Sequence, residues 1–123
     1  MRLDKLSKAT VAALEDIKGR DIVVLDVRKM TSLFDKIIVA TADSTRQAAA
    51  MARNVQEKLK AQGYNIGGVE GERVAEWILV DLGSVIVHIM QPATRQHYNL
   101  EELWTPPRAA RRPRARAAPT AAG

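Results

Sequence analysis

The chain has 123 residues, of which 46% are hydrophobic and 27% charged, a composition typical of one folded domain and not of a disordered chain. It contains no cysteine, which excludes disulfides, thiol nucleophiles, thiolate zinc sites and iron–sulfur clusters. The net charge of +5 is carried by the last segment: residues 105–123 hold five of the 19 basic residues and no acid, so residues 1–104 balance 14 basic against 14 acidic side chains.

The first third of the chain predicts one helix and two strands. Apolar residues recur at helical spacing over residues 3–18, and Gly19 follows where a helix C-cap belongs. The β-branched run 21–27 predicts a strand buried on both faces. A second apolar run, residues 36–41, follows a polar stretch and predicts a second strand.

The clearest helix signal lies in residues 44–63. Ser44 and Gln47 have the spacing of a capping box, in which each side chain satisfies an N–H group at the helix start. Gly63 is placed to end this helix. Its predicted buried stripe consists of Ala48, Met51, Ala52, Val55 and Leu59.

The remaining elements complete an α-β-β-α-β-β-β-α order. Gly67 and Gly68 mark a short strand, and residues 69–73 look like a turn. Residues 76–81 and 84–90 flank Leu82-Gly83 as the two strands of a hairpin. Pro92 is typical of the first turn of a last helix, which we expect to end at Trp104. The order favours an α/β fold with a single mixed β-sheet flanked by helices.

Residues 105–123 are predicted to be a disordered tail after a domain of residues 1–104. The tail contains four of the five prolines and, proline aside, no apolar residue larger than alanine, so it cannot bury enough surface to order itself. Its five arginines suit an arm that binds polyanions such as RNA. A solvated extension without a partner is an equal alternative.

The hairpin has one apolar face and one mixed face. Val85, Val87 and Ile89 alternate on a face that we expect in the core. A two-residue turn at Leu82-Gly83 would place Trp77 beside His88 and match the two mixed faces, so we favour it over a three-residue loop.

The mixed face suggests a protein-binding surface. Trp77 and Leu79 lie beside Asp81 and His88 on it, which combines an aromatic anchor with polar groups for specificity. The alternative is that a helix covers this face and that Trp77 belongs to the core. The periodicity of the strands does not favour either interpretation of this face over the other.

No catalytic constellation can be assembled from the sequence. His88 and His97 are nine residues apart without a third zinc ligand at suitable spacing. Glu70 and Glu72 form the one acid-x-acid pair, the minimum for a carboxylate metal site, but a solvated turn accounts for them better. We therefore expect that the protein is not an enzyme and that it binds no cofactor and no metal ion.

Four motifs resemble the ribosomal silencing factor (Iojap) family. They are Asp43-Ser-Thr-Arg-Gln47, Glu70-Gly71, Trp77-x-Leu-x-Asp-x-Gly-x-Val-x-Val-His-Ile89 and Arg95-x-x-Tyr-x-Leu-Glu-x-Leu-Trp104. They follow in order over nearly all of residues 1–104. Ala75 replaces a usual glycine, which could alter the approach to the hairpin, and Lys36 replaces a commoner aromatic or polar residue. The arginine-rich tail lies outside the family pattern.

The resemblance implies a nucleotidyltransferase-like fold without a catalytic site and a cytoplasmic translation repressor. Such a factor binds the large ribosomal subunit at its intersubunit face, on large-subunit protein fourteen, and blocks joining of the small subunit. The implied contact residues are Trp77, Leu79 and Asp81, with His88, Glu70 and Tyr98 as further candidates.

Three alternatives remain open at this point. The tail alone could make the chain a general RNA-binding protein or add an rRNA contact. The Glu70/Glu72 pair could belong to a metal-dependent nucleotidyltransferase. An exposed Trp77/Leu79 face could also form a homodimer that competes with the ribosome. No apolar run approaches the roughly 20 residues of a membrane-spanning helix, so we expect no membrane association.

Overall fold

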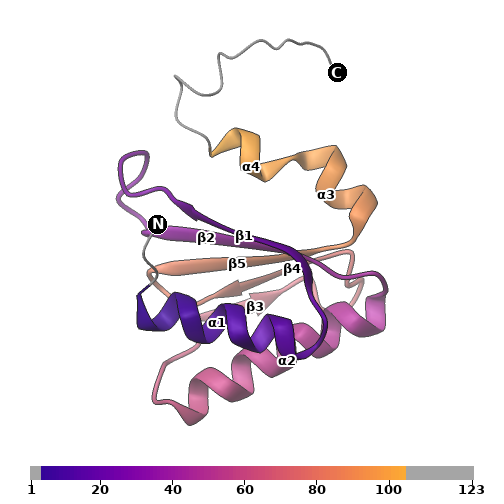
Figure 1. Cartoon of the computed structure of the whole chain (residues 1–123), viewed down its shortest axis with the longest axis horizontal. Coiled ribbons are helices and arrows are strands. Elements are labelled where there is room, and N and C mark those ends of the chain that lie inside the picture. Colours follow the sequence, from indigo (N-terminus) through magenta and orange to yellow (C-terminus); the bar gives the residue numbers. More distant parts are fainter. Residues whose placement is uncertain (1–3, 105–123) are drawn as a thin grey trace.

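The computed structural model describes residues 4–104, which form one five-stranded sheet between two helical layers (Figure 1). The helices are α1 (Lys5–Asp16), α2 (Thr45–Ala61), α3 (Pro92–Tyr98) and α4 (Leu100–Leu103). The strands are β1 (Arg20–Asp26), β2 (Lys36–Thr41), β3 (Gly68–Glu70), β4 (Trp77–Asp81) and β5 (Val85–Met90). The α/β class with a single mixed sheet is confirmed. The predicted tail, residues 105–123, lies outside the described residues.

The sheet is mixed because one chain crossover joins its two antiparallel parts. Within residues 4–104 the strand order is β1-β2-β5-β4-β3. β2 and β5 run parallel at the centre, while each outer pair is antiparallel. α2 makes the crossover from β2 and packs beside α1 on one face, and α3 and α4 lie over the other face (Figure 1).

The main core lies between the sheet and the α1/α2 layer. Val85, Val87 and Ile89 point into it, as predicted from their alternation. The predicted stripe of α2 is confirmed in full, since Ala48, Met51, Ala52, Val55 and Leu59 are all completely buried. Burial of these apolar side chains fixes the α1/α2 layer on one face of the sheet.

The helix ends differ from the expected patterns in two details. Ser44 Oγ accepts from Gln47 N at 3.0 Å as predicted, but Gln47 Oε1 accepts from Asp43 N, one residue before the capping-box partner. The Gln47 amide also donates to the carbonyls of Ile17 and Lys18 and so ties α2 to the end of α1. At that end Lys18, and not Gly19, takes the left-handed conformation (φ 64°).

Two strand predictions were wrong. β1 lies at the sheet edge with half-exposed side chains and is not buried on both faces, whereas every residue of β2 is buried. A β-branched run alone does not distinguish an edge strand from a central one. Residues 69–73 were expected as a turn, but β3 continues to Glu70, and the turn follows it.

The hairpin turn lies one residue later than predicted. Trp77 pairs with Met90, Leu79 with His88 and Asp81 with Ile86, and the backbone closes with a bond from Leu82 N to Val85 O. This register keeps Leu82 buried, whereas a turn at Leu82-Gly83 would expose it. Moving the turn by one residue changes the cross-strand partner of each β4 residue by two positions. The two faces therefore keep their predicted composition.

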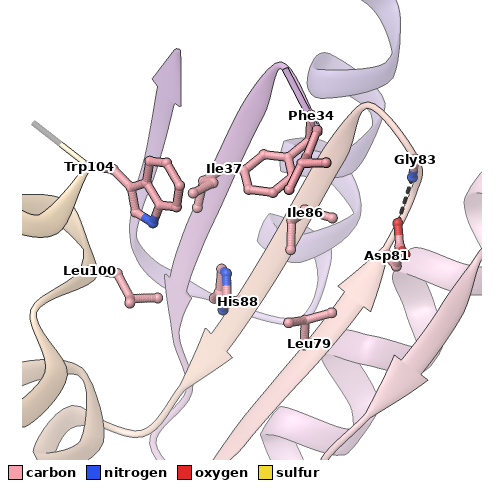
Figure 2. Close-up of a pocket in the computed structure, with 10 residues that line it drawn as sticks. Phe34, Ile37, Leu79, Asp81, Gly83, Ile86, His88, Leu100 and Trp104 are labelled. Atoms are coloured by element: carbon pink, nitrogen blue, oxygen red, sulfur yellow. Dashed lines mark hydrogen bonds between the residues drawn. The ribbon is translucent and has the colours of Figure 1, made fainter. Parts of the chain in front are cut away.

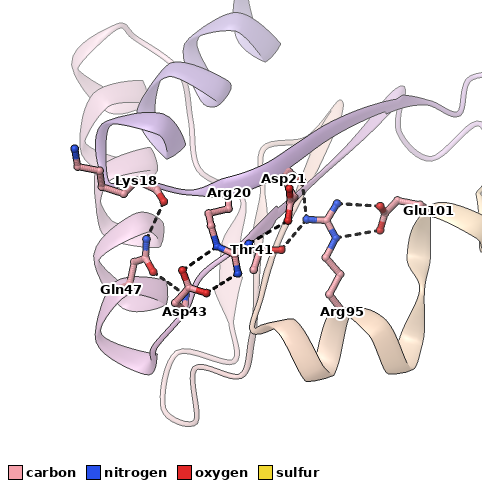
Figure 3. Close-up of polar contacts among 8 residues, drawn as sticks. All are labelled: Lys18, Arg20, Asp21, Thr41, Asp43, Gln47, Arg95 and Glu101. Atoms are coloured by element: carbon pink, nitrogen blue, oxygen red, sulfur yellow. Dashed lines mark hydrogen bonds and ion pairs between the residues drawn. The ribbon is translucent and has the colours of Figure 1, made fainter.

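The last helix is broken in two, and an arginine fastens both halves to the sheet. Asn99 has a left-handed conformation (φ 45°) between α3 and α4. Arg95 of α3 pairs with both carboxylate oxygens of Glu101 and donates to Asp21 O and Thr41 Oγ1 at 2.6 and 2.8 Å (Figure 3). The α3–α4 segment therefore covers one end of the second sheet face.

Candidate partner-binding site

The predicted contact residues share the sheet face that α1 and α2 leave free. Glu70, Leu79 and His88 form one row across β3, β4 and β5, because each is the register partner of the next. Trp77 and Asp81 flank Leu79 on β4 and point to the same side. The structure thus brings five of the six candidates onto one face, and Tyr98 of α3 joins them through Trp77.

A groove of about 480 Å³ lies over the open end of this face (Figure 2). Its walls come from the β4–β5 hairpin, the loop before β2, and α4 with the residue after it. The lining is mostly apolar and consists of Leu33, Phe34, Ile37, Leu79, Asp81, Gly83, Ile86, His88, Leu100 and Trp104. An apolar concave surface with a few polar groups is the usual form of a recognition site.

Trp77 is only partly buried and does not line the groove. The centroid of its ring lies 4.7 Å from that of the Tyr98 ring. The side chain also packs against a second, smaller core cluster that includes Met90 and Leu100. Its indole Nε1 donates to His88 Nδ1 at 2.9 Å. Tyr98 of α3 therefore covers the Trp77 end of the face in part, while the groove leaves the Leu79 end open.

The two acidic candidates differ in their surroundings. Asp81 is half-buried in the groove, and its Oδ1 accepts from Gly83 N at 2.8 Å, which supports the hairpin turn. Glu70 is exposed near the edge of the sheet. Both carboxylates lie on the face of the groove, so this face attracts positive charge.

His88 is kept neutral by its surroundings. It is only 8% exposed, and burial lowers its pKa to about 4. The buried ring accepts from Trp77 through Nδ1, which a protonated imidazole could not do. The folded protein therefore contains His88 in its neutral form.

Acidification should destabilise the fold through His88. The unfolded histidine has its ordinary pKa near 6.5 and takes up a proton first as the pH falls, so stability is complete above 6.5 and declines between 6.5 and 4. We expect a loss of about 2 kcal/mol between pH 7 and pH 5. Urea titrations at both pH values measure it. His88→Asn, which keeps an acceptor for Trp77, should lose this contribution; an unchanged slope would refute the assignment.

Several groove residues were not predicted as site residues. Phe34 and Trp104 meet edge to face, with ring centroids 5.6 Å apart, although they are 70 positions apart in the chain. Leu33 is 80% exposed beside them. An exposed leucine in a polar stretch carries no periodic signal, so only the folded arrangement shows that it extends the hairpin surface.

Ala75, the departure from the family pattern before β4, has a positive φ of 62°. Glycine adopts this conformation without steric cost, which accounts for the usual residue there. The alanine methyl is buried in the main core, and Ala75 O accepts from Gln91 Nε2 at 3.1 Å. The approach to the hairpin is therefore strained but well anchored.

Residues 4–104 contain neither a membrane-spanning helix nor a metal-binding cluster. Within that part of the chain, no helix is long and apolar enough to cross a bilayer. No group of three or more His, Asp or Glu side chains in the same range is arranged to hold a metal ion.

The fold defines an α/β domain with a single mixed sheet, and comparison with known proteins gives its family. The family model described as "Ribosomal silencing factor during starvation" matches residues 1–122. The chain belongs to the ribosomal silencing factor family, a family of ribosome-associated regulators of translation. The match extends into residues that we expected to lie outside the family pattern.

Individual relatives agree with this assignment. The chain is 54% identical over 104 residues to ribosomal silencing factor RsfS of Chromobacterium violaceum, which covers 85% of each chain. It is 48% identical over 91 residues to RsfS of Haemophilus influenzae, covering 74% of this chain and 89% of that one. A crystal structure of protein CV0518 from Chromobacterium violaceum superposes with a TM-score of 0.82 at 50% identity, covering 93% of this chain and 92% of that chain.

Proposed function

We propose that this chain is a cytoplasmic repressor that binds the large ribosomal subunit and blocks joining of the small subunit by steric occlusion. Its docking point is large-subunit protein fourteen on the intersubunit face. The observation that carries the proposal is the open, apolar groove on the sheet face of a ribosomal silencing factor. Occlusion requires binding and no reaction, so the function needs no catalytic group.

The groove supplies both parts of a protein contact. Leu79 and Ile86 are half-buried on its floor and can bury further apolar surface when a partner covers them. Asp81 and Glu70 on the same face can pair with basic side chains of the partner. Trp77 supports this surface beside the groove through its contacts with His88 and Tyr98.

Leu33 offers a clean test of the groove. It lines the groove while 80% exposed, so Leu33→Ala removes contact surface at little expense in stability. We expect binding to isolated large subunits to weaken about fivefold, which corresponds to roughly 1 kcal/mol. Leu103→Ala is the matched control, because Leu103 is 66% exposed and does not line the groove. Equal affinities of the two variants would contradict the proposed docking surface.

The arginines of residues 105–123 should add an ionic contact with rRNA. Replacing all five with glutamine in the full chain should weaken large-subunit binding without abolishing it. Each lost phosphate contact should reduce the slope of log affinity against log salt by about 0.7 to 0.9. Binding measured from 50 to 200 mM salt gives that slope. Complete loss of binding would instead favour the tail-driven RNA-binding function.

A homodimer formed through the same face would exclude the ribosome. Exposed Leu33 and half-buried Leu79 would be covered in both complexes, so each would compete with the other. Under this proposal, any dimer dissociates before subunit binding. Sedimentation at several protein concentrations, with and without large subunits, measures that competition.

A further inference from the structure

A single imidazole lies among the apolar side chains on the groove floor. Figure 2 shows His88 between Leu100 of α4 and Leu79 of β4. His88 as a whole is 8% exposed and therefore more than nine-tenths buried. Such a group has to satisfy its hydrogen-bonding atoms locally, because little water reaches it.

The bond with Trp77 determines which ring nitrogen carries the proton. Indole Nε1–H can only donate, so His88 Nδ1, 2.9 Å away, must accept with its lone pair. In a neutral imidazole the other nitrogen then carries the hydrogen. His88 is therefore an Nε2–H donor whose orientation Trp77 fixes.

This donor is left unused by the part of the protein that the structure describes. Within residues 4–104 no hydrogen bond from His88 Nε2 is found, while Ser7 Oγ is the sole fully buried side-chain polar atom without a partner. His88 Nε2 is consequently not sealed in the core, and the opening available to it is the groove that its ring lines. A partner that covered it without an acceptor would leave a buried N–H unsatisfied, which opposes binding.

We propose that His88 is a specificity-determining residue of the groove, whose Nε2–H donates to an uncharged carbonyl or hydroxyl oxygen of the protein segment that docks there. This inference rests on the proposed function and names the chemistry that the ribosomal partner presents. A carboxylate is disfavoured as the acceptor, because Asp81 shares the groove and Glu70 lies in the same cross-strand row. The docking segment thus combines apolar surface for Leu79 and Ile86, a neutral oxygen for His88 and a basic group for Asp81.

His88→Asn separates the internal bond from the proposed recognition. The asparagine Oδ1 can still accept from Trp77 Nε1, but no donor remains at the Nε2 position. We expect the variant to fold, to keep the Trp77 indole N–H signal in NMR spectra, and to bind isolated large subunits about fivefold to tenfold more weakly. Unchanged affinity would overturn the inference. Failure of the unmodified chain to bind large subunits would overturn the proposed function itself, so the two failures are distinguishable.

Nitrogen-15 NMR of the unmodified full chain tests the same point if the variant does not fold. The free protein should show His88 as the Nε2–H tautomer, and adding purified large-subunit protein fourteen should shift that N–H signal. The opposite tautomer, or a signal that the partner leaves unchanged, would refute the role of His88. A signal that changes with the concentration of the chain alone would assign the groove to a second copy and would also refute it.

Discussion

Replacing Gly71 with alanine should destabilise the protein by at least about 3 kcal/mol, because two effects add there. Gly71 has a φ of +89°, a conformation that side-chain-bearing residues rarely adopt. A Cβ at this position would also lie 2.1 Å from the backbone oxygen of Trp77, far inside contact distance. The start of β4 would have to move, and with it the bond between Trp77 and His88.

Gly63→Ala separates the two effects. Gly63 has a nearly identical φ of +93°, but a Cβ there meets nothing within 4 Å. This control should therefore cost only the conformational strain, about 1 to 2 kcal/mol. Urea unfolding of both variants measures the difference. Equal losses of stability would show that the contact with Trp77 O does not constrain position 71.

Arg95→Met should be the second most damaging change, with an expected loss of about 3 kcal/mol. The Arg95 side chain is only 12% exposed and joins four oxygen atoms: two of Glu101, one of Thr41 and the carbonyl of Asp21. Methionine keeps much of the side-chain volume but removes every one of these bonds. We expect α3 and α4 to loosen from the sheet and Trp77 to lose its contact with Tyr98.

Arg53→Met is the control for this change. Arg53 is exposed on α2, on the opposite face of the sheet from α3. Its replacement should alter stability by less than about 0.5 kcal/mol. Tryptophan fluorescence and urea unfolding follow the two variants. If Arg95→Met is as stable as Arg53→Met and keeps the same emission maximum, the α3–α4 segment does not depend on Arg95.

The sequence predicts this fold well wherever local periodicity and burial agree. The α2 stripe and the apolar hairpin face emerge correctly because each follows one period over several residues. The hairpin turn lies one residue later than predicted because its position depends on the burial of Leu82 and on the hydrogen bond between Asp81 and Gly83. The alternation of apolar and polar residues indicates neither of these. The edge position of β1 likewise depends on strand order.

The site was predictable only on the hairpin. Alternation placed Leu79, Asp81 and His88 on one face, and the structure agrees. Leu33 and Trp104 reach the groove from distant parts of the chain, so no spacing rule connects them with the hairpin. The position of Trp77 also depends on Tyr98 of α3, whose ring partly covers the expected surface anchor. The composition of a groove built from remote segments appears only after folding.

Co-sedimentation with isolated ribosomal subunits tests the central claim most directly. The purified full chain is mixed with large and small subunits, separately and together, and the joined ribosomes are measured on sucrose gradients. We predict that the chain travels with the large subunit alone and that joined ribosomes decrease. At equal protein concentration, Leu33→Ala should leave more ribosomes joined than Leu103→Ala does. Equal binding to both subunits, fading with salt and leaving subunit joining unchanged, would contradict the account.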